Sequence, residues 1–367
     1  SEDKNFSCEH NRCYIPQKIE TARRLYNNRT IVADFRKYNL FNKKEDSEVI
    51  KISIDDIASF FLEPKKVFFK NKLNLDITFY DKDINEVIEP FYEDKYDIEN
   101  SITKYIFEYF KNNAINIEKC ISEDIKYERE KGLKPEEFYS LYFKDKAIKN
   151  INDVFNFIKE KENFLPLLNS TPVDKEDIEY QYNYNGKSYL INGKLESFLV
   201  DKNKNKVYDF YYTDNFNIDS FFYKEFIKKI FILALKSKKD KVNSSIMVIT
   251  DKKTFNFDIN LDLKKIIDFY IKWIYERDEI FNIERKIILN NYNKKEKNLD
   301  CDFNKYKEDF EIKRNFEENE NYNKRFYISD MDILIDDEKI LPDEETFCEY
   351  KDMFLNVLNM WESRNEL

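Results

Sequence analysis

The feature that most constrains the fold is a run of alternating apolar and polar residues over 178–214, IEYQYNYNGKSYLINGKLESFLVDKNKNKVYDFYYTD. Alternation with a period of two is typical of strands that bury one face. Asn185-Gly186 has the composition of a type I′ hairpin turn, and DKNKNK at 201–206 provides a second, longer turn. The sequence therefore predicts a meander of three antiparallel strands.

Segments on either side of the meander complete a core of helices and strands. The segment 151–164 has helical spacing and is stopped by Pro166, and 219–238 follows the meander as a helix with one buried face. The segments 244–250 and 254–260 are rich in β-branched and aromatic residues, as strands are. The order α-β-β-β-α-β, with a crossover helix after the meander, predicts a mixed α/β (α+β) fold.

Further helices are predicted from apolar spacing and from capping residues. Ser53 is a good N-cap for the helix that follows it, and Pro64 should end that helix before a second one begins. In the helix after the meander, Asp219 or Ser220 is the expected N-cap. The other expected helices span 98–121, 262–281 and 346–361.

Composition excludes several classes of function. The chain has three glycines and contains no GxGxxG loop and no P-loop, so left-handed turns must be made by Asn or Asp. A single histidine, His10, excludes most histidine-based catalysis. Proteins whose main task is to hold DNA are usually basic, and this chain has a net charge of −10. Any contact with nucleic acid must therefore be local.

Cysteine usage and hydropathy predict a cytoplasmic protein without a membrane span. Five scattered cysteines are typical of reduced thiols in the cytosol. No apolar run approaches the length of about 18 residues that a spanning helix needs. Cys8, His10 and Cys13 could begin a zinc site, but no second ligand pair lies nearby, so no metal is predicted.

Several motifs, taken in their order along the chain, resemble one protein family. They are ISIDDIASFFLEPKKVFFKNKLNLDI at 52–77, EREKGLKPEEF at 128–138, YKEFIKKIFILALK at 223–236 and ENYNKRFY at 320–327. Together with the meander they resemble the C-terminal region of the gamma chain of exodeoxyribonuclease V, the RecC family, over most of residues 50–360. Related break-processing nucleases carry an iron–sulfur cysteine before the proline of the first motif, where this chain has Glu63.

The resemblance implies a fold and a role. In that family the C-terminal domain is similar to the PD-(D/E)XK nuclease domain of the RecB-type beta chain, but it lacks the active site. It implies a restriction-endonuclease-like αβββαβ core with additional helices over 47–291. An arm from a larger chain would precede it at 1–46, and a charged segment with a C-terminal helix packed on the same domain would follow at 292–367.

The implied role is that of a non-catalytic scaffold and DNA guide. The family belongs to a helicase–nuclease complex that acts in double-strand break repair and recombination. The implied partners are the beta and alpha chains of exodeoxyribonuclease V and DNA, and no cofactor is implied.

The candidate site combines one carboxylate on each of two predicted strands. In nucleases of this fold two acidic residues hold Mg²⁺, and a lysine two positions after the second acid orients or activates the attacking water. Glu196 and Asp209 match the two acids. Tyr211 stands in the place of the lysine, and a phenol supplies no positive charge at neutral pH. We therefore expect a vestigial site that holds no metal.

Two alternatives stay open. A lysine of the next helix, Lys224 or Lys228, could take the missing place, which would make the chain an active Mg²⁺-dependent DNA nuclease. An unrelated acidic interaction protein would explain the composition but not the order of the motifs. In a vestigial site, by contrast, the two acids would be solvated or would pair with lysines such as Lys194 or Lys206.

DNA contacts are expected at the two turns of the meander. Lys202, Lys204 and Lys206 place three positive charges in the longer turn, where a duplex could be separated. Tyr182 and Tyr184, beside the first turn, could stack on bases.

Overall fold

The structure is a computed structural model. It describes residues 49–73, 95–112, 116–130, 148–149, 151–156, 167, 169–250, 253–277, 283, 285–293, 298–299, 301–310 and 342–366. Several predictions lie outside these residues: the Cys8–His10–Cys13 segment, the arm over 1–46, most of the motif at 128–138 and the motif at 320–327. No helix of the described residues is long and apolar enough to cross a membrane.

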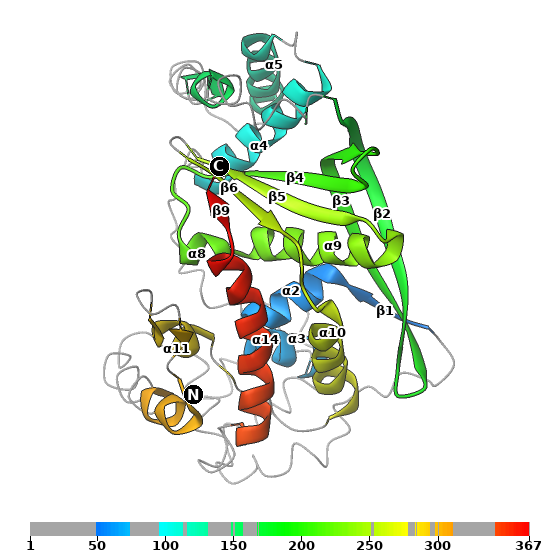
Figure 1. The fold of residues 1–367 in the computed structure, drawn as a ribbon, viewed down its shortest axis with the longest axis vertical. Coiled ribbons are helices and arrows are strands. Elements are labelled where there is room, and N and C mark those ends of the chain that lie inside the picture. Colours follow the sequence, from blue (N-terminus) through cyan, green and yellow to red (C-terminus); the bar gives the residue numbers. More distant parts are fainter. Residues whose placement is uncertain are drawn as a thin grey trace, which may run out of the picture. The chain divides into compact units, whose positions relative to one another are not determined.

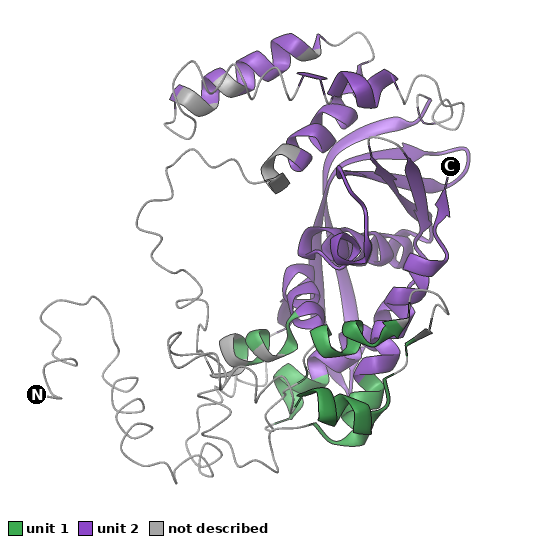
Figure 2. Ribbon diagram, turned by 90° about the vertical axis from the view of Figure 1, so that its left-hand side faces the viewer, with its two compact units in different colours: residues 1–46, 63–81, 272–349 green, residues 47–62, 82–271, 350–367 purple. Residues whose placement is uncertain are grey.

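The chain forms two compact units, which Figure 2 distinguishes by colour. The first unit comprises residues 1–46, 63–81 and 272–349, and the second, here called the sheet unit, comprises 47–62, 82–271 and 350–367. The candidate site residues all belong to the sheet unit. The division of the chain at 46/47 and 291/292 stays a prediction.

A mixed sheet forms the centre of the sheet unit. In the described residues it has seven strands in the order β1-β3-β4-β5-β6-β9, with β2 paired to β3 beside this path. The strand bounds are β1 Ile50–Ser53, β2 Thr171–Tyr184, β3 Lys187–Asp201, β4 Lys206–Tyr212, β5 Asn243–Ile249, β6 Thr254–Asp258 and β9 Asn365–Glu366. The predicted mixed α/β (α+β) class is confirmed.

The meander and its crossover helix form as predicted. β2, β3 and β4 are consecutive antiparallel strands, and Figure 1 shows β2 and β3 as a long ribbon. Helix α9 (Lys224–Asp240) then returns the chain so that β5 runs parallel to β4, with Asp209 opposite Ile246. A parallel neighbour requires such a crossover, because a tight turn reverses the direction of the chain.

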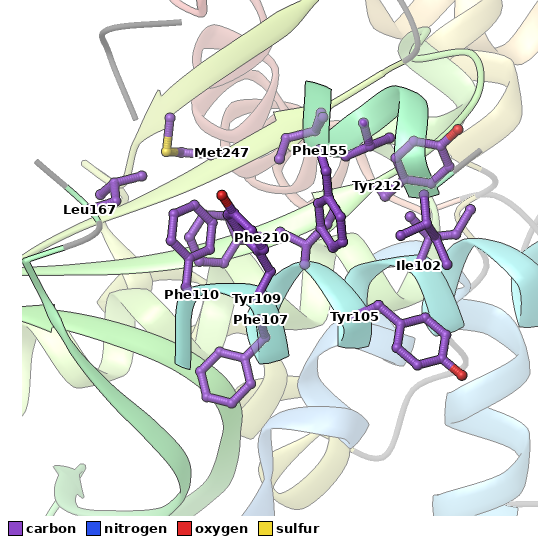
Figure 3. Close-up of a cluster of buried hydrophobic side chains, with 14 of the residues drawn as sticks. Ile102, Tyr105, Phe107, Tyr109, Phe110, Phe155, Leu167, Phe210, Tyr212 and Met247 are labelled. Atoms are coloured by element: carbon purple, nitrogen blue, oxygen red, sulfur yellow. The ribbon is translucent and has the colours of Figure 1, made fainter. Parts of the chain in front are cut away.

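The two faces of β4 pack on different helices. Alternate side chains of a strand point to opposite faces. Tyr208, Phe210 and Tyr212 belong to a buried cluster with helix α4 (Lys95–Lys111), in which the Phe110 and Phe210 rings are stacked with centroids 5.0 Å apart (Figure 3). Asp209 and Tyr211, on the other face, contact residues of α9.

The predicted helix over 98–121 is two helices, so this prediction was wrong. α4 ends at Lys111, and α5 spans Ile117–Glu130. The Asn116 side chain accepts a hydrogen bond from the Lys119 N–H at 3.0 Å. An Asn side chain that satisfies a free N–H favours the start of a new helix over continuation of the old one.

The predicted helix over 219–238 is also divided. α8 spans Ile218–Phe221 and is followed by α9. The N-cap of α8 is Asn217, not Asp219 or Ser220: its Oδ1 accepts the N–H groups of those two residues at 2.9 and 3.0 Å. The N-cap is therefore the residue directly before the helix, two positions before Asp219.

Helices α2 (Ile54–Leu62) and α3 (Pro64–Leu73) confirm the predicted break at Pro64. Ser53 accepts the Asp55 N–H at 3.0 Å and caps α2 as expected. Proline suits the first position of a helix, where no partner for its N–H is needed.

The C-terminal part also forms helices. The remaining helical bounds are α10 Leu263–Ile271, the π-helix η5 Lys272–Glu276, α11 Arg285–Asn290 and α14 Glu344–Glu362, and a small hairpin pairs β7 (Tyr292–Asn293) with β8 (Asn298–Leu299). Within the sheet unit, the Tyr350 hydroxyl donates to the Phe61 carbonyl at 2.6 Å. The Phe354 ring stacks on Phe222, with centroids 4.6 Å apart.

Left-handed backbone positions are made mostly without glycine, as the composition requires. Asn185 and Asn205, in the two turns of the meander, have φ of 47° and 50°. Ser197 within β3 and Lys241 at the end of α9 have φ of 57° and 55°. Asn was predicted for such positions, whereas Ser and Lys there were not expected, because a side chain with a Cβ is disfavoured in this region.

Candidate functional site

Asp209 forms a buried ion pair with Lys229. Its side chain is 1% exposed, whereas that of Lys229 is 25% exposed. The Lys229 ammonium donates to both carboxylate oxygens, at 2.7 and 2.8 Å, and the Phe210 N–H donates to Oδ1 at 2.6 Å. Both oxygens of this carboxylate are therefore already occupied within the protein.

The setting of Asp209 shifts its titration. Burial raises the pKa of the carboxyl, because a charge is costly to remove from water, while the charge of Lys229 and the hydrogen bonds from Lys229 and Phe210 oppose that rise. The carboxylate thus depends on Lys229 for its charge balance.

Glu196 lies in a different environment. Its side chain is 55% exposed and pairs with Lys194 on the same strand. Across the ladder it faces Lys175 of β2. The pairing of β3 with β4 covers only three residues of each strand and ends at Leu199 opposite Tyr208, so the ladder does not hold Glu196 against Asp209.

The environment of Glu196 is rich in lysine. Burial and the charges of Lys175 and Lys228 lower the pKa of Lys194, and Asp177 opposes that shift. In the part of the chain that the structure describes, no group of three or more His, Cys, Asp or Glu side chains is arranged to hold a metal ion. The two predicted acids pair with different lysines, Glu196 with Lys194 and Asp209 with Lys229.

Tyr211 occupies the lysine position as a core residue. It is 3% exposed, and its ring meets Phe226 of α9 edge to face at 5.1 Å. A lysine at this position would have to place its ammonium in an aromatic cluster, which is costly without a partner.

Neither of the two α9 lysines selected from the sequence, Lys224 and Lys228, is the one that pairs with Asp209. Lys224 is exposed, and Lys228 pairs with Asp55 at 2.8 Å and with Glu225 at 3.9 Å. Lys229, which the sequence analysis did not select, is the lysine that reaches Asp209.

A signal in the sequence could have identified Lys229. It lies three residues after Phe226 and four before Leu233, both fully buried, so it sits on the apolar stripe of the helix. Lys236, seven residues on, is also on this side and pairs with Glu176 of β2. A lysine on a buried stripe needs a carboxylate partner.

The turn from β3 to β4 exposes two of the three lysines that were selected as DNA contacts, and that role stays a prediction. Lys202 and Lys204 are exposed. Asp201 Oδ1 accepts the backbone N–H of Lys204 at 3.1 Å, and this bond stabilises the turn. Lys206 is half-buried and pairs with Asp258 at 2.8 Å.

The two tyrosines of the first hairpin differ from each other. Tyr182 is 5% exposed, and its hydroxyl donates to the Asp268 carboxylate of α10. Burial, together with that bond, raises the pKa of Tyr182. Tyr184 is half-buried at the end of β2. Base stacking by Tyr182 would require the hairpin to leave α10.

Comparisons with known proteins add little to this geometry. No family model matches the chain, and no curated protein matches it. Among solved structures, one described as "Crystal structure of SSO0001" matches with 13% identity over 72% of this chain and 91% of that chain, with a TM-score of 0.27. An identity and a TM-score this low identify neither a family nor a function for the chain.

Proposed function

We propose that this chain is a nuclease-derived domain without catalysis of its own, which serves as scaffold and DNA guide in a cytoplasmic helicase–nuclease complex of the exodeoxyribonuclease V type. The observation that carries the proposal is the Asp209–Lys229 pair. An acid that should bind a metal instead accepts two bonds from a lysine and is buried under α9.

Charge and shape favour a structural role for this pair. A Mg²⁺ site needs carboxylate oxygens that are open to the ion and to water. Asp209 has neither oxygen open, and Tyr211 packs in the core where a catalytic lysine would stand. The residues as arranged do not fit a metal, and no cofactor is proposed.

The proposed partners follow from the resemblance of the motifs to the gamma chain. They are the beta and alpha chains of exodeoxyribonuclease V and DNA, in repair and recombination at double-strand breaks. The exposed Lys202 and Lys204 support a local DNA contact on an otherwise acidic chain. Co-expression of the chain with the beta and alpha chains of its source, followed by size-exclusion chromatography, tests the scaffold: separate elution of the three chains would refute it.

Cleavage of linear double-stranded and single-stranded DNA tests the catalytic silence. The wild-type chain and the Asp209→Ala variant are assayed with Mg²⁺ and with Mn²⁺. We expect both to stay at the rate of buffer alone. Metal-dependent cleavage by the wild type that Asp209→Ala abolishes would contradict the proposal.

A second candidate function is favoured by one distance. Lys229 Nζ lies 2.7 Å from Asp209 Oδ1, so a lysine from the crossover helix does stand beside the acid. The alternative is an active Mg²⁺-dependent DNA nuclease in which Lys229, rather than Lys224 or Lys228, replaces the missing lysine. Lys229→Met would then abolish cleavage while Lys224→Met would leave it unchanged, whereas the silent domain gives no cleavage in any variant.

A further inference from the structure

Two lysine-rich segments that are far apart in the sequence meet at one end of the sheet. The turn from β3 to β4 and the connection from α9 to β5 are joined by two hydrogen bonds: Asn205 Nδ2 donates to the Lys241 carbonyl at 3.1 Å, and the Asn243 N–H donates to the Asn205 carbonyl at 3.0 Å. The segments 201–206 and 236–243 together carry seven lysines and two aspartates.

The acidic side chains of these segments and of the adjoining strand are engaged within the protein. Asp201 is buried and accepts N–H groups of its own turn, Asp240 pairs with Lys236 at 2.5 Å, and Asp258 pairs with Lys206 at 2.8 Å. These three carboxylates are therefore engaged by groups of the protein itself.

The outward lysines of the two segments keep their charge toward solvent. Lys202, Lys204, Lys239 and Lys241 are all exposed, and the described residues provide no ion pair to any of them. Lys238, also exposed, lies over the rings of Tyr180 and Tyr182 at 5.5 and 5.8 Å. We call these five lysines the turn–helix lysine patch: Lys202, Lys204, Lys238, Lys239 and Lys241.

We propose that the turn–helix lysine patch binds the phosphate backbone of double-stranded DNA. The proposal rests on the proposed function and extends it from the meander turn to α9, which brings in Lys238, Lys239 and Lys241. A cluster of positive charge on a chain with net charge −10 concentrates binding of a polyanion at one place.

The lack of fully exposed aromatic rings among the described residues near the patch favours a duplex over a single strand. Binding of single strands combines phosphate contacts with aromatic side chains on which bases stack. The described rings near the patch are covered in whole or in part: Tyr182 is 5% and Tyr208 9% exposed, and the half-buried Tyr180 lies beneath Lys238. Lysines alone can neutralise phosphates without reading the sequence, so binding by the patch should be independent of sequence and sensitive to salt.

The test measures binding of the 367-residue chain to a fluorescent duplex of random sequence without divalent metal. The test variant replaces Lys202, Lys204, Lys239 and Lys241 by Gln and keeps Lys238, which packs on the tyrosine rings. The matched control replaces four other exposed lysines by Gln, so that it changes the net charge equally: Lys119, Lys126, Lys264 and Lys265.

We expect the test variant to bind at least about tenfold more weakly at about 50 mM salt. The magnitude of the slope of log affinity against log salt should fall by about 4, close to one for each lysine removed. The control should keep the wild-type slope. Equal affinities of the test variant and the control would overturn the proposal, as would tighter binding of a single strand than of the duplex. Because the assay contains no metal and measures no cleavage, its failure leaves the silent-site proposal intact, and metal-dependent cleavage would leave the patch intact.

Discussion

Replacing Lys229 by methionine tests whether the buried ion pair is a structural element of the sheet unit. Methionine keeps most of the volume of the lysine stem but leaves Asp209 buried without its partner. Removal of one partner of a buried pair typically costs about 3–5 kcal/mol. Since Lys229 is 25% exposed and water can reach its end of the pair, we expect a loss near the lower limit, about 3 kcal/mol at about pH 8.

The loss should depend on pH in a defined direction. Burial already raises the pKa of Asp209, and without Lys229 that pKa rises further. When the pKa of a group is higher in the folded than in the unfolded state, protonation favours the folded state. The stability linked to that group is fully present below the ordinary aspartate pKa and is lost as pH rises through the raised folded-state pKa. The variant should therefore be less destabilised at about pH 5 than at about pH 8.

Urea denaturation followed by circular dichroism measures both effects. Asp209→Asn combined with Lys229→Met removes the unpaired charge and should recover about 1–2 kcal/mol relative to Lys229→Met alone. Lys224→Met, on the exposed side of the same helix, is the control and should stay within about 0.5 kcal/mol of the wild type. The reasoning is refuted if Lys229→Met matches the wild type at about pH 8, or if its loss of stability does not shrink at lower pH.

Three further variants test the packing around the site. Tyr182→Phe removes the bond to the Asp268 carboxylate and should lower the free energy of unfolding by about 1.5–3 kcal/mol, measured by urea denaturation; an unchanged midpoint would contradict this. At Gly193, a Cβ would lie 3.0 Å from the Ile232 side chain, so Gly193→Val should cost about 1–3 kcal/mol, and Ile232→Ala in the same chain should reduce that cost. Glu99, 3% exposed, accepts two hydrogen bonds at the end of β4, and Glu99→Ala should lower the melting temperature, whereas a match to the wild type would show those bonds to be dispensable.

Local patterns were sufficient to predict the meander and its crossover. The turn at Asn185-Gly186 and the alternation around it depend on residues close in sequence, and each strand found its neighbour through the turn that precedes it. The predicted helix bounds were wrong where an Asn side chain begins a new helix. Asn116 and Asn217 each accept a backbone N–H that has no partner within the helix. Such caps are single residues, and periodicity does not register them.

The site was less accessible to prediction, because its decisive contact joins two elements. Asp209 was identified from its place on a strand, but its partner Lys229 is 20 residues away on α9. Which lysine of α9 reaches Asp209 depends on how the helix packs on the sheet. The prediction named Lys228, one position from the lysine that binds, and one position on a helix turns a side chain by about 100°. Glu196 was identified from its place on the neighbouring predicted strand and its match to the first acid of the nuclease pattern. The sequence does not reveal how short the β3–β4 ladder is, and in the structure Glu196 pairs with Lys194.

The left-handed positions that this chain fills with Asn, Ser and Lys have a consequence for how its surface can change over evolutionary time. A glycine at such a position has no side chain and contributes nothing to the charge of the surface. Lys241 ends α9 and at the same time contributes a positive charge. Turns of this kind, each held at a local strain of about 1–2 kcal/mol, are positions where a point mutation can rewrite surface charge while the path of the chain stays the same.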